Sequence, residues 1–269
     1  MKITILAENL TFTDEHFFGE PGPSYLIEAD GKTILFDTGF SDLYIKNAKK
    51  LNADLSKIDA IVLSHGHNDH ATGIKDFPFP SKDLSLITHP GCFIPKYYGS
   101  TYIGASISKE EAELNYNYIP TVEPYFITPN VAFLGEIPVV HDFEQRTQAG
   151  ELKIDDKTEP DYLIDDTAMA IRTSKGVIVI TGCSHSGVCN IIDQAKKVFN
   201  TESIISILGG FHLRSAEKPR LERTTAFFEK NVTGIVYAGH CTGFKAKYML
   251  NTKVSIEEPY VGEVIEIPD

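Results

Sequence analysis

Short apolar runs bounded by glycine, proline and charged residues mark the N-terminal part of the chain. Runs of about four to eight apolar residues between such turn residues are typical of buried β-strands. The pattern therefore predicts strands over residues 1–6, 24–28, 33–36, 58–63 and 84–88.

Two helices are predicted in the same part of the chain. Ser41 is a suitable N-cap for a helix that continues to Leu51. Its inward-facing residues are predicted to be Leu43, Ile45 and Ala48. The run Ser108-Lys109-Glu110-Glu111 marks the start of the second helix.

The C-terminal half repeats one theme, in which an apolar strand leads into small residues and a histidine. Strands are predicted over residues 177–180, 204–208 and 235–237, and they lead to His185, His212 and His240. Helical patterns follow at residues 187–199, 217–230 and 243–250. Strands that alternate with helices predict an α/β fold. Together with the predicted 58–63 strand, which leads into the histidines of residues 65–70, four strands end in a small residue and a histidine. Because function gathers at the carboxyl ends of strands in open α/β sheets, we expect these four strand ends to meet at one edge.

Residues 141–165 are rich in charge and poor in large apolar side chains. Two interpretations stay open, namely a segment that closes over a site and a solvated loop. Neither interpretation makes it a linker, and we predict one domain over residues 1–269.

Composition and charge narrow the class of protein. The 269 residues are 42% hydrophobic and 23% charged, which is ordinary for a globular protein. No apolar run approaches the roughly 20 residues that span a bilayer, and the N-terminus lacks the pattern of a signal peptide. We therefore expect a cytoplasmic protein that does not bind membranes.

The net charge of −12 argues against nucleic acid as a partner, because phosphate binding needs Lys and Arg patches. The four cysteines form no Cys-x-x-Cys pair, so no disulfide framework is expected. The partner that remains is a small-molecule substrate. Nothing in the sequence indicates an oligomeric state.

The most informative segment is Ser-His-Gly-His-Asn-Asp-His at residues 64–70, directly after the predicted 58–63 strand. Imidazole and carboxylate groups are good ligands for Zn²⁺, Fe and Mn. A strand end followed by a tight turn can direct His65 and His67 to one point, with Asp69 and His70 reaching a second point nearby. A purely structural cluster would bury these groups at a cost in free energy. The spacing therefore predicts a cradle for two metal ions.

This motif resembles the signature of the metallo-β-lactamase superfamily, and Phe36-Asp37-Thr38-Gly39 resembles its early Asp-Thr-Gly motif. The resemblance extends over essentially the whole chain. It implies an α/β fold of the αββα four-layer sandwich type, with two mixed sheets flanked by helices.

The resemblance also implies the metal ligands. His65, His67 and His185 are expected to hold one ion, and Asp69, His70 and His240 the other. The ions are expected to be two divalent metals, Zn²⁺ with Fe or Mn as alternatives.

Three ligand questions stay open. His141 is an alternative to His185 as the third ligand of the first site. Cys183 stands near the position where most members carry a bridging Asp, and it either ligates as a thiolate or is a small buried residue. Asp37 is expected to orient a ligand imidazole.

Residues 181–190, 209–213 and 239–243 together resemble the subgroup named after 7,8-dihydropterin-6-yl-methyl-4-(β-D-ribofuranosyl)aminobenzene-5′-phosphate synthase. This implies a small, phosphorylated or pterin-like substrate. His212 is expected to contact an anionic group or to be structural, and Asp69 to accept a proton. The chain departs from the subgroup at residues 20–24, which lack a histidine.

These observations lead to a hypothesis of a dinuclear metal-dependent hydrolase-type enzyme, with a synthase-like transferase as a variant. One alternative is a general ester, thioester or lactone hydrolase, which a substrate profile would distinguish. Another is a metal-binding sensor without turnover, in which the metal would have no exchangeable water. A mechanism that depends on a covalent step at Cys183 is a further alternative.

Overall fold

The computed structural model describes residues 1–267 and divides them into two compact units, each built on its own sheet. The first unit contains residues 1–122, 148–165 and 260–267, and the second contains residues 123–147 and 166–259. Each unit has its own hydrophobic core. The prediction of a single domain stays a prediction.

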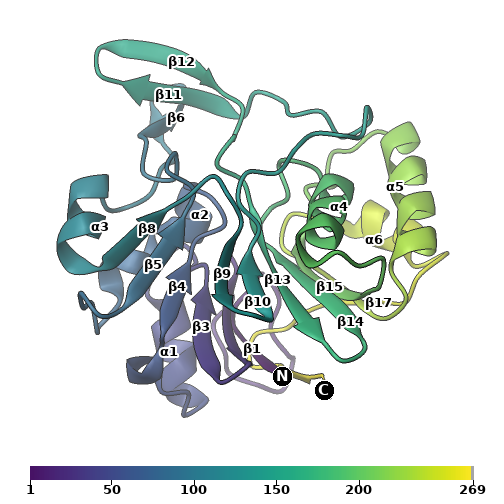
Figure 1. Cartoon of the computed structure of the whole chain (residues 1–269), viewed down its shortest axis with the longest axis horizontal. Helices are drawn as coiled ribbons and strands as arrows, with labels where there is room; N and C mark the ends of the chain where they lie inside the picture. The colour runs from purple at the N-terminus through teal and green to yellow at the C-terminus, as the bar shows by residue number, and fades with distance from the viewer. Residues whose placement is uncertain (268–269) are drawn as a thin grey trace. The chain divides into compact units, whose positions relative to one another are not determined.

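A seven-stranded mixed sheet forms the first unit, in the order β18-β1-β2-β3-β4-β5-β8 (Figure 1). Strands β18 to β3 pair antiparallel, and β3 to β8 pair parallel. The five strands predicted in this region are present as β1 to β5, although β4 covers only three residues. The bounds are β1 (Lys2–Ala7), β2 (Ser24–Ala29), β3 (Lys32–Phe36), β4 (Ala60–Val62), β5 (Ser85–Thr88), β8 (Asn117–Pro120) and β18 (Val264–Glu266).

Helix α1 differs from its prediction in its N-cap, which is Asp42 and not Ser41, and in the face that it buries. Its bounds are Leu43–Lys50, and Leu43 and Ile45 are only half-buried. The inward position is taken by a polar residue, Asn47, because its side-chain amide donates to the carbonyls of Leu6 and Phe18 at 2.8 Å each. The fully buried side chains of this helix are Tyr44, Asn47 and Ala48.

The other helical segments of this unit are short. Helix α3 (Lys109–Asn115) begins directly after its N-cap Ser108, within the predicted run, with a complete capping box between Ser108 and Glu111. The remaining segments are α2 (Asn68–Ala71), η1 (Leu55–Lys57) and η2 (Gly73–Asp76).

A second, four-stranded sheet in the first unit has the order β12-β11-β6-β7. Its hairpin, β11 (Gly150–Ile154) and β12 (Lys157–Asp161), lies beside β6 (Lys96–Tyr98) in Figure 1, and β7 is Thr101–Tyr102. The interpretation of residues 141–165 as a solvated loop is therefore wrong for this hairpin. Pro160 is tolerated because β12 is the edge strand.

The second unit also has a seven-stranded mixed sheet, in the order β17-β16-β15-β14-β13-β10-β9. Strands β14 to β17 pair parallel, and β14 to β9 pair antiparallel. The predicted strands and helices of this half are all present. The bounds are β9 (Tyr125–Thr128), β10 (Val131–Phe133), β13 (Ala168–Thr173), β14 (Gly176–Thr181), β15 (Ile204–Gly210), β16 (Val236–Gly239), β17 (Ile256–Glu257), α4 (Val188–Phe199), α5 (Lys218–Asn231) and α6 (Phe244–Leu250).

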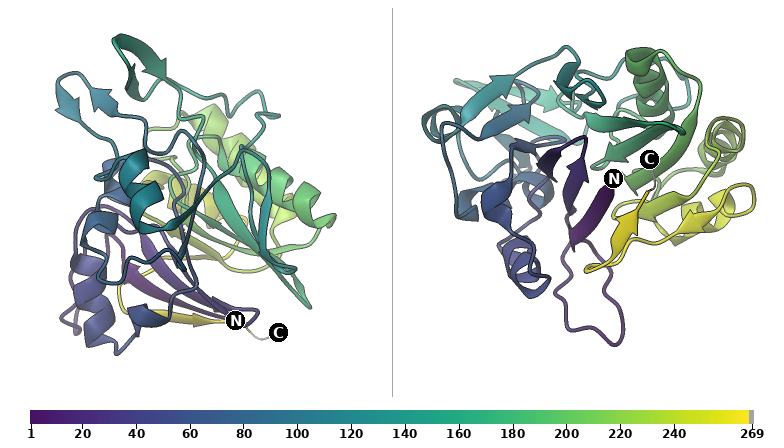
Figure 2. Two further views of the ribbon diagram at one scale, coloured as in Figure 1. Left: turned by 60° about the vertical axis from the view of Figure 1, so that its left-hand side comes forward. Right: turned by 60° about the horizontal axis from the view of Figure 1, so that its bottom comes forward.

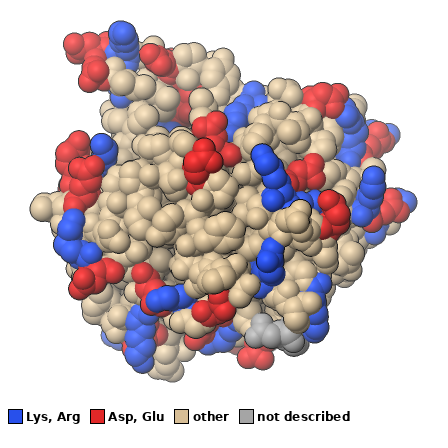
Figure 3. Space-filling model, in the orientation of Figure 1, with Lys and Arg blue, Asp and Glu red and all other residues tan. Residues whose placement is uncertain are grey.

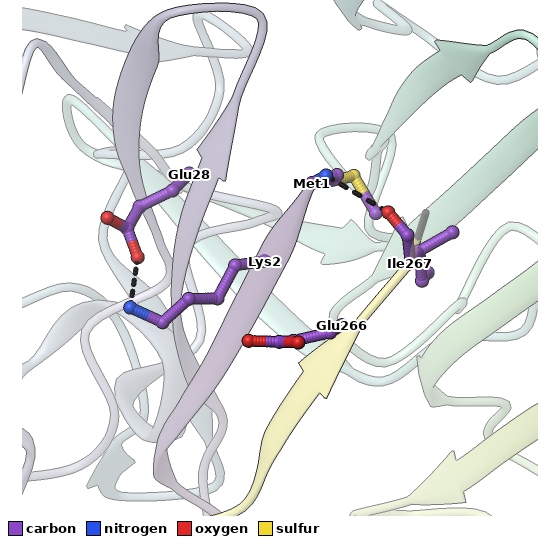
Figure 4. A pocket seen from close by; sticks show the side chains of 5 residues that line it. All are labelled: Met1, Lys2, Glu28, Glu266 and Ile267. Atoms are coloured by element: carbon purple, nitrogen blue, oxygen red, sulfur yellow. Dashed lines mark hydrogen bonds and ion pairs between the residues drawn. The ribbon is translucent and has the colours of Figure 1, made fainter. Parts of the chain in front are cut away.

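The first and last strands of the first unit are neighbours in its seven-stranded sheet. β1 and β18 lie side by side in both views of Figure 2. The Met1 amino group donates to the Ile267 carbonyl at 3.0 Å, and Lys2 and Glu28 form an ion pair at 2.5 Å beside Glu266 (Figure 4). These residues line an open hollow on the surface.

Acidic and basic side chains are interspersed on the face drawn in Figure 3 and do not gather into one basic patch there. Within residues 1–267, no helix combines the length and the apolar character that a membrane span requires.

Candidate metal centre

The 64–70 segment gathers three imidazoles within the first unit. Strand β4 leads into it, and α2 begins directly after His67, which is the N-cap residue. The ring centroids of His65 and His67 are 4.8 Å apart, and those of His65 and His70 are 4.2 Å apart. An Asp69 carboxylate oxygen is 3.7 Å from His70 Nε2. The predicted histidines and carboxylate of this unit therefore lie together.

Asp37 fixes the orientation of His70 from a fully buried position after β3. Its Oδ2 is 2.7 Å from His70 Nδ1 and accepts from Ser64 Oγ at 2.7 Å, while its Oδ1 accepts from Ser64 N at 2.7 Å. A carboxylate can only accept, so the hydrogen-bond network assigns the proton of a neutral His70 ring to Nδ1. This leaves Nε2 as the metal-binding nitrogen. The orienting role expected for Asp37 agrees with this geometry.

Close backbone approach explains the glycines that bracket the motif. A Cβ atom at Gly66 would lie 1.8 Å from the Cys92 carbonyl oxygen, and one at Gly73 would lie 2.0 Å from the Thr38 carbonyl oxygen. Only glycine fits at either position without moving the loop.

A buried ion-pair network that sequence reasoning missed supports the same loop. Gly66 N donates to Asp165 Oδ2 at 2.8 Å, and Lys96 Nζ reaches Asp165 Oδ1 at 2.9 Å and Asp161 Oδ2 at 3.3 Å. Burial alone would raise the pKa of Asp165, but the Lys96 ammonium holds it below its usual value. The sequence signal was limited to the charge-rich 141–165 segment.

Burial lowers the pKa of His67 to about 4. The ring is therefore neutral at neutral pH, which is the form that binds metals.

In the second unit, parallel strand ends bring a second set of donors together. The ligand atoms of Cys183, His185 and His212 all lie within 4.8 Å of one another. The ring centroids of His185 and His212 are 4.2 Å apart, and His240 Nε2 is 3.1 Å from Cys183 Sγ. These residues follow β14, β15 and β16, so three of the four strand ends that were expected to meet lie together within this unit.

Three residues at these strand ends have positive φ. His212 and His240 have φ values of 48° and 43°, and Ser184 has 61°. Non-glycine residues in this region carry a conformational cost and gather at functional sites. The fold holds these side chains in positions that relaxed strands would not provide.

Two buried carboxylates hold the loop after β14, and sequence reasoning missed both. Asp166 Oδ2 accepts from Ser186 N at 2.8 Å and from the Ser186 hydroxyl. Glu144 Oε2 accepts from Cys189 N at 2.8 Å and Asn190 N at 3.2 Å, at the start of α4. Burial raises the pKa of each carboxyl group.

His141, the alternative to His185 as third ligand of the first site, lies in different surroundings. His141 Nε2 is 2.8 Å from Asp193 Oδ2, and among the described residues of the second unit His141 joins no cluster of three candidate ligands.

Burial alone would raise the pKa of the Cys241 thiol, but contacts with Cys183, His240 and His212 hold it well below its usual range.

Each unit therefore presents a donor set that suits a divalent metal. The first unit supplies imidazoles and a carboxylate, and the second supplies imidazoles and a thiol.

Comparison with known proteins identifies the family. The sequence profile of the Metallo-beta-lactamase superfamily matches residues 18–199. The chain belongs to the metallo-β-lactamase superfamily. Superfamily members commonly bind divalent metals, which agrees with the donor sets of both units.

Two proteins of Methanocaldococcus jannaschii are similar to this superfamily member along nearly its full length. One is 7,8-dihydropterin-6-methyl-4-(β-D-ribofuranosyl)-aminobenzene-5′-phosphate synthase, with 29% identity over 99% of this chain and 96% of that protein. The other is the uncharacterized protein MJ0448, with 34% identity over 98% of this chain and 100% of that protein. The predicted resemblance to the subgroup of this synthase is confirmed.

The fold class is confirmed by a solved structure of Tm1679, described as a metal-dependent hydrolase of the β-lactamase superfamily. It has a TM-score of 0.87 and 29% identity, and the match covers 100% of both chains. An α/β fold with two mixed sheets and flanking helices is therefore established for this metallo-β-lactamase superfamily chain.

Proposed function

We propose that this chain is a metal-dependent enzyme that acts on a small, phosphorylated or pterin-like molecule. The Asp37–His70 contact is the observation that carries the proposal. A buried carboxylate that fixes the tautomer of an imidazole is the typical support of a metal-binding histidine. A hydrogen bond of this kind between buried groups 33 residues apart is part of a preorganised site.

The proposed ligands keep the assignment made from the sequence. His65, His67 and His185 hold one divalent ion, and Asp69, His70 and His240 hold the other. Cys183 is an additional ligand, which its 3.1 Å contact with His240 supports. The proposed metal is Zn²⁺, with Fe or Mn as alternatives. The donor clusters within each unit support the two halves of this assignment separately.

Bound divalent metals supply Lewis acidity and lower the pKa of a coordinated water. In this proposal, Asp69 accepts the proton that the reaction releases, because its side chain is partly solvent-exposed and can pass the proton on. His212 contacts an anionic group of the substrate, which its position just after Gly209-Gly210, at the end of β15, supports. Asp37 acts only through His70.

A simple metal-dependent hydrolase is the second candidate, favoured by the description of Tm1679. Turnover of plain esters, thioesters or lactones with no preference for a phosphate or pterin group would select this candidate. Turnover that joins a dihydropterin to a ribosylated aminobenzene phosphate would select the synthase-like transferase, which the similarity to the archaeal synthase supports.

Elemental analysis of the purified protein tests the metal assignment. We expect about two metal ions per chain in wild type, and loss of metal and activity together in His67→Ala. The matched control is His16→Ala, because His16 is an exposed histidine of the same unit. Full activity in a metal-free His67→Ala protein would refute the proposal. Tightly bound metal with no turnover of any substrate would instead support a sensor.

Cys183→Ala tests the thiol separately. If Cys183 is a ligand, the variant loses part of its metal, and the His240→Ala variant shows a similar loss. Wild-type metal content in Cys183→Ala would remove Cys183 from the ligand set and leave the other six in place.

A further inference from the structure

A pocket of about 350 Å³ lies within the first unit, between the β11–β12 hairpin and the segment that joins β5 to β6. Figure 1 shows this hairpin beside β6. The volume falls in the range of small-molecule sites, which is about 300–1,000 Å³. Every residue that lines this pocket belongs to the first unit.

The pocket has a polar, buried floor and an apolar rim. Lys96, Asp161 and Asp165 line it with exposed fractions of 1%, 2% and 3%. The apolar lining includes Leu152 and Ile164, and Ile164 is 51% exposed. A ligand that enters this pocket therefore meets apolar side chains first and charged groups at the bottom.

The charges on the floor favour hydrogen-bond donors. Two carboxylates share one ammonium, so the floor carries a formal charge of about −1 at neutral pH. Each carboxylate has about four acceptor positions. Asp161 uses one for Leu163 N and one for Lys96, and Asp165 uses one for Gly66 N and one for Lys96. Acceptor capacity therefore remains on both side chains.

The same charges disfavour a phosphate group. Lys96 supplies the ammonium group of the pocket, and it is already held between Asp161 and Asp165. His89 also lines the pocket, and its Nδ1 accepts from Gly91 N at 3.0 Å. A phosphate would meet two carboxylates against one ammonium on this floor. A phosphorylated substrate would have to place its phosphate elsewhere.

The floor is joined directly to the metal-binding motif. Asp165 accepts from Gly66 N, and Gly66 lies between His65 and His67 in the chain. A ligand on the floor would therefore contact the residue that supports this loop.

We infer that this pocket binds a flat aromatic heterocycle edge first, with ring N–H and amino donors facing the carboxylates of Asp161 and Asp165. The apolar rim covers the faces of the ring. The pocket thus recognises the ring part of the substrate, and this reading of the substrate rests on the proposed function.

Two pteridine probes that differ at position 2 of the ring test the inference by isothermal titration calorimetry on the metal-loaded protein. Pterin carries a 2-amino group, whereas lumazine carries a carbonyl oxygen in its place. Hydrogen bonds to a charged acceptor make pterin the tighter ligand, by about tenfold or more. Equal affinity for the two probes, or binding of neither, would overturn the inference.

Variants locate the binding to this pocket. Ile164→Trp fills the rim at an exposed position and is expected to weaken pterin binding about tenfold or more. Ile154→Trp is the matched control, because Ile154 lies on the same hairpin but outside the pocket and is 37% exposed. Asp161→Asn is expected to reduce the preference for pterin over lumazine. Unchanged pterin affinity in Ile164→Trp would place the ligand elsewhere and refute the inference.

Binding and turnover separate this inference from the proposed function. Pterin bound in the pocket with no metal-dependent turnover would retain the inference and reject the enzyme. Turnover that is unaffected by Ile164→Trp would retain the enzyme and reject the pocket as its ring site.

Discussion

The Asp37→Asn substitution tests how far the carboxylate decides the metal affinity of His70. Wild-type Asp37 accepts three hydrogen bonds at 2.7 Å, one from Ser64 N, one from Ser64 Oγ and one with His70 Nδ1. The new amide has the same shape but only one oxygen. Asn also tolerates the positive φ of 55° at this position, so backbone strain does not confuse the result.

Both orientations of the amide have a defined cost. If its oxygen replaces Oδ1, the amide NH₂ faces His70 Nδ1, and the ring proton must move to Nε2, the proposed metal-binding nitrogen. If its oxygen replaces Oδ2, the NH₂ faces the backbone N–H of Ser64. That buried donor then lacks a partner, at a cost of about 1–3 kcal/mol.

We therefore expect Asp37→Asn to weaken metal binding about 10–100-fold, which corresponds to about 1.4–2.8 kcal/mol. Competition with a chromophoric chelator measures the affinity. Nitrogen NMR shifts of His70 in metal-free protein report the tautomer independently of activity. The control is Asp59→Asn, which should leave metal affinity unchanged. Asp59 lies directly before β4, and its carboxylate accepts from Lys32 Nζ and Thr33 N.

Wild-type affinity in Asp37→Asn, with the proton still on Nδ1, would refute this reasoning. A loss of affinity without a change of tautomer would show that Asp37 acts through the stability of the loop.

Two further predictions concern buried charge. Lys96→Met leaves Asp161 and Asp165 buried without their shared cation and is expected to lower the free energy of unfolding by about 3–5 kcal/mol. The control is Lys32→Met at a partly exposed ion pair, which should lower the free energy of unfolding by at most about 1 kcal/mol. The folded pKa of Asp165 lies below its usual 3.8, so this stabilisation is fully present above that pH and is lost as the pH falls from there through the folded pKa. Urea unfolding in steps from pH 7 downward should therefore show the difference between wild type and Lys96→Met narrowing only below about pH 3.8, and a constant difference contradicts this. Glu144→Gln keeps an oxygen that accepts from the first residues of α4, and it removes a carboxyl group whose pKa burial raises. The variant should therefore be more stable than wild type at pH 7. This gain should vanish when the pH falls below 4.5, the usual pKa of a Glu carboxyl group. Thermal melts from pH 4 to 8 measure the effect, and a gain that does not depend on pH would show that charge is not its cause.

The sequence was sufficient for the elements whose side chains carry a periodic signal. Strands β1 to β5 and β14 to β16 bury nearly all of their side chains, and helices α4, α5 and α6 began within one residue of their predictions. The histidine motif was equally readable, because its members are neighbours in the chain and strand ends position them locally.

Strand β12 shows why the solvated-loop interpretation failed for residues 150–161. Four of its five side chains are exposed, so it has no hydrophobic alternation, and its pairing with β11 alone defines it as a strand. Helix α1 shows the opposite case, a buried residue that the hydrophobic pattern does not predict. Asn47 is buried because its side chain donates to two backbone carbonyls, and not because it is hydrophobic.

The sequence alone thus determined the family, the fold class and the donors that lie within a few residues of a strand end. The tertiary structure alone decided which distant residues support them. Asp165 meets Gly66 across 99 residues, and Lys96 reaches Asp165 across 69. Such contacts leave no local pattern, because a hydrogen bond between two folded segments depends on the path of the chain between them and not on the residues beside either partner.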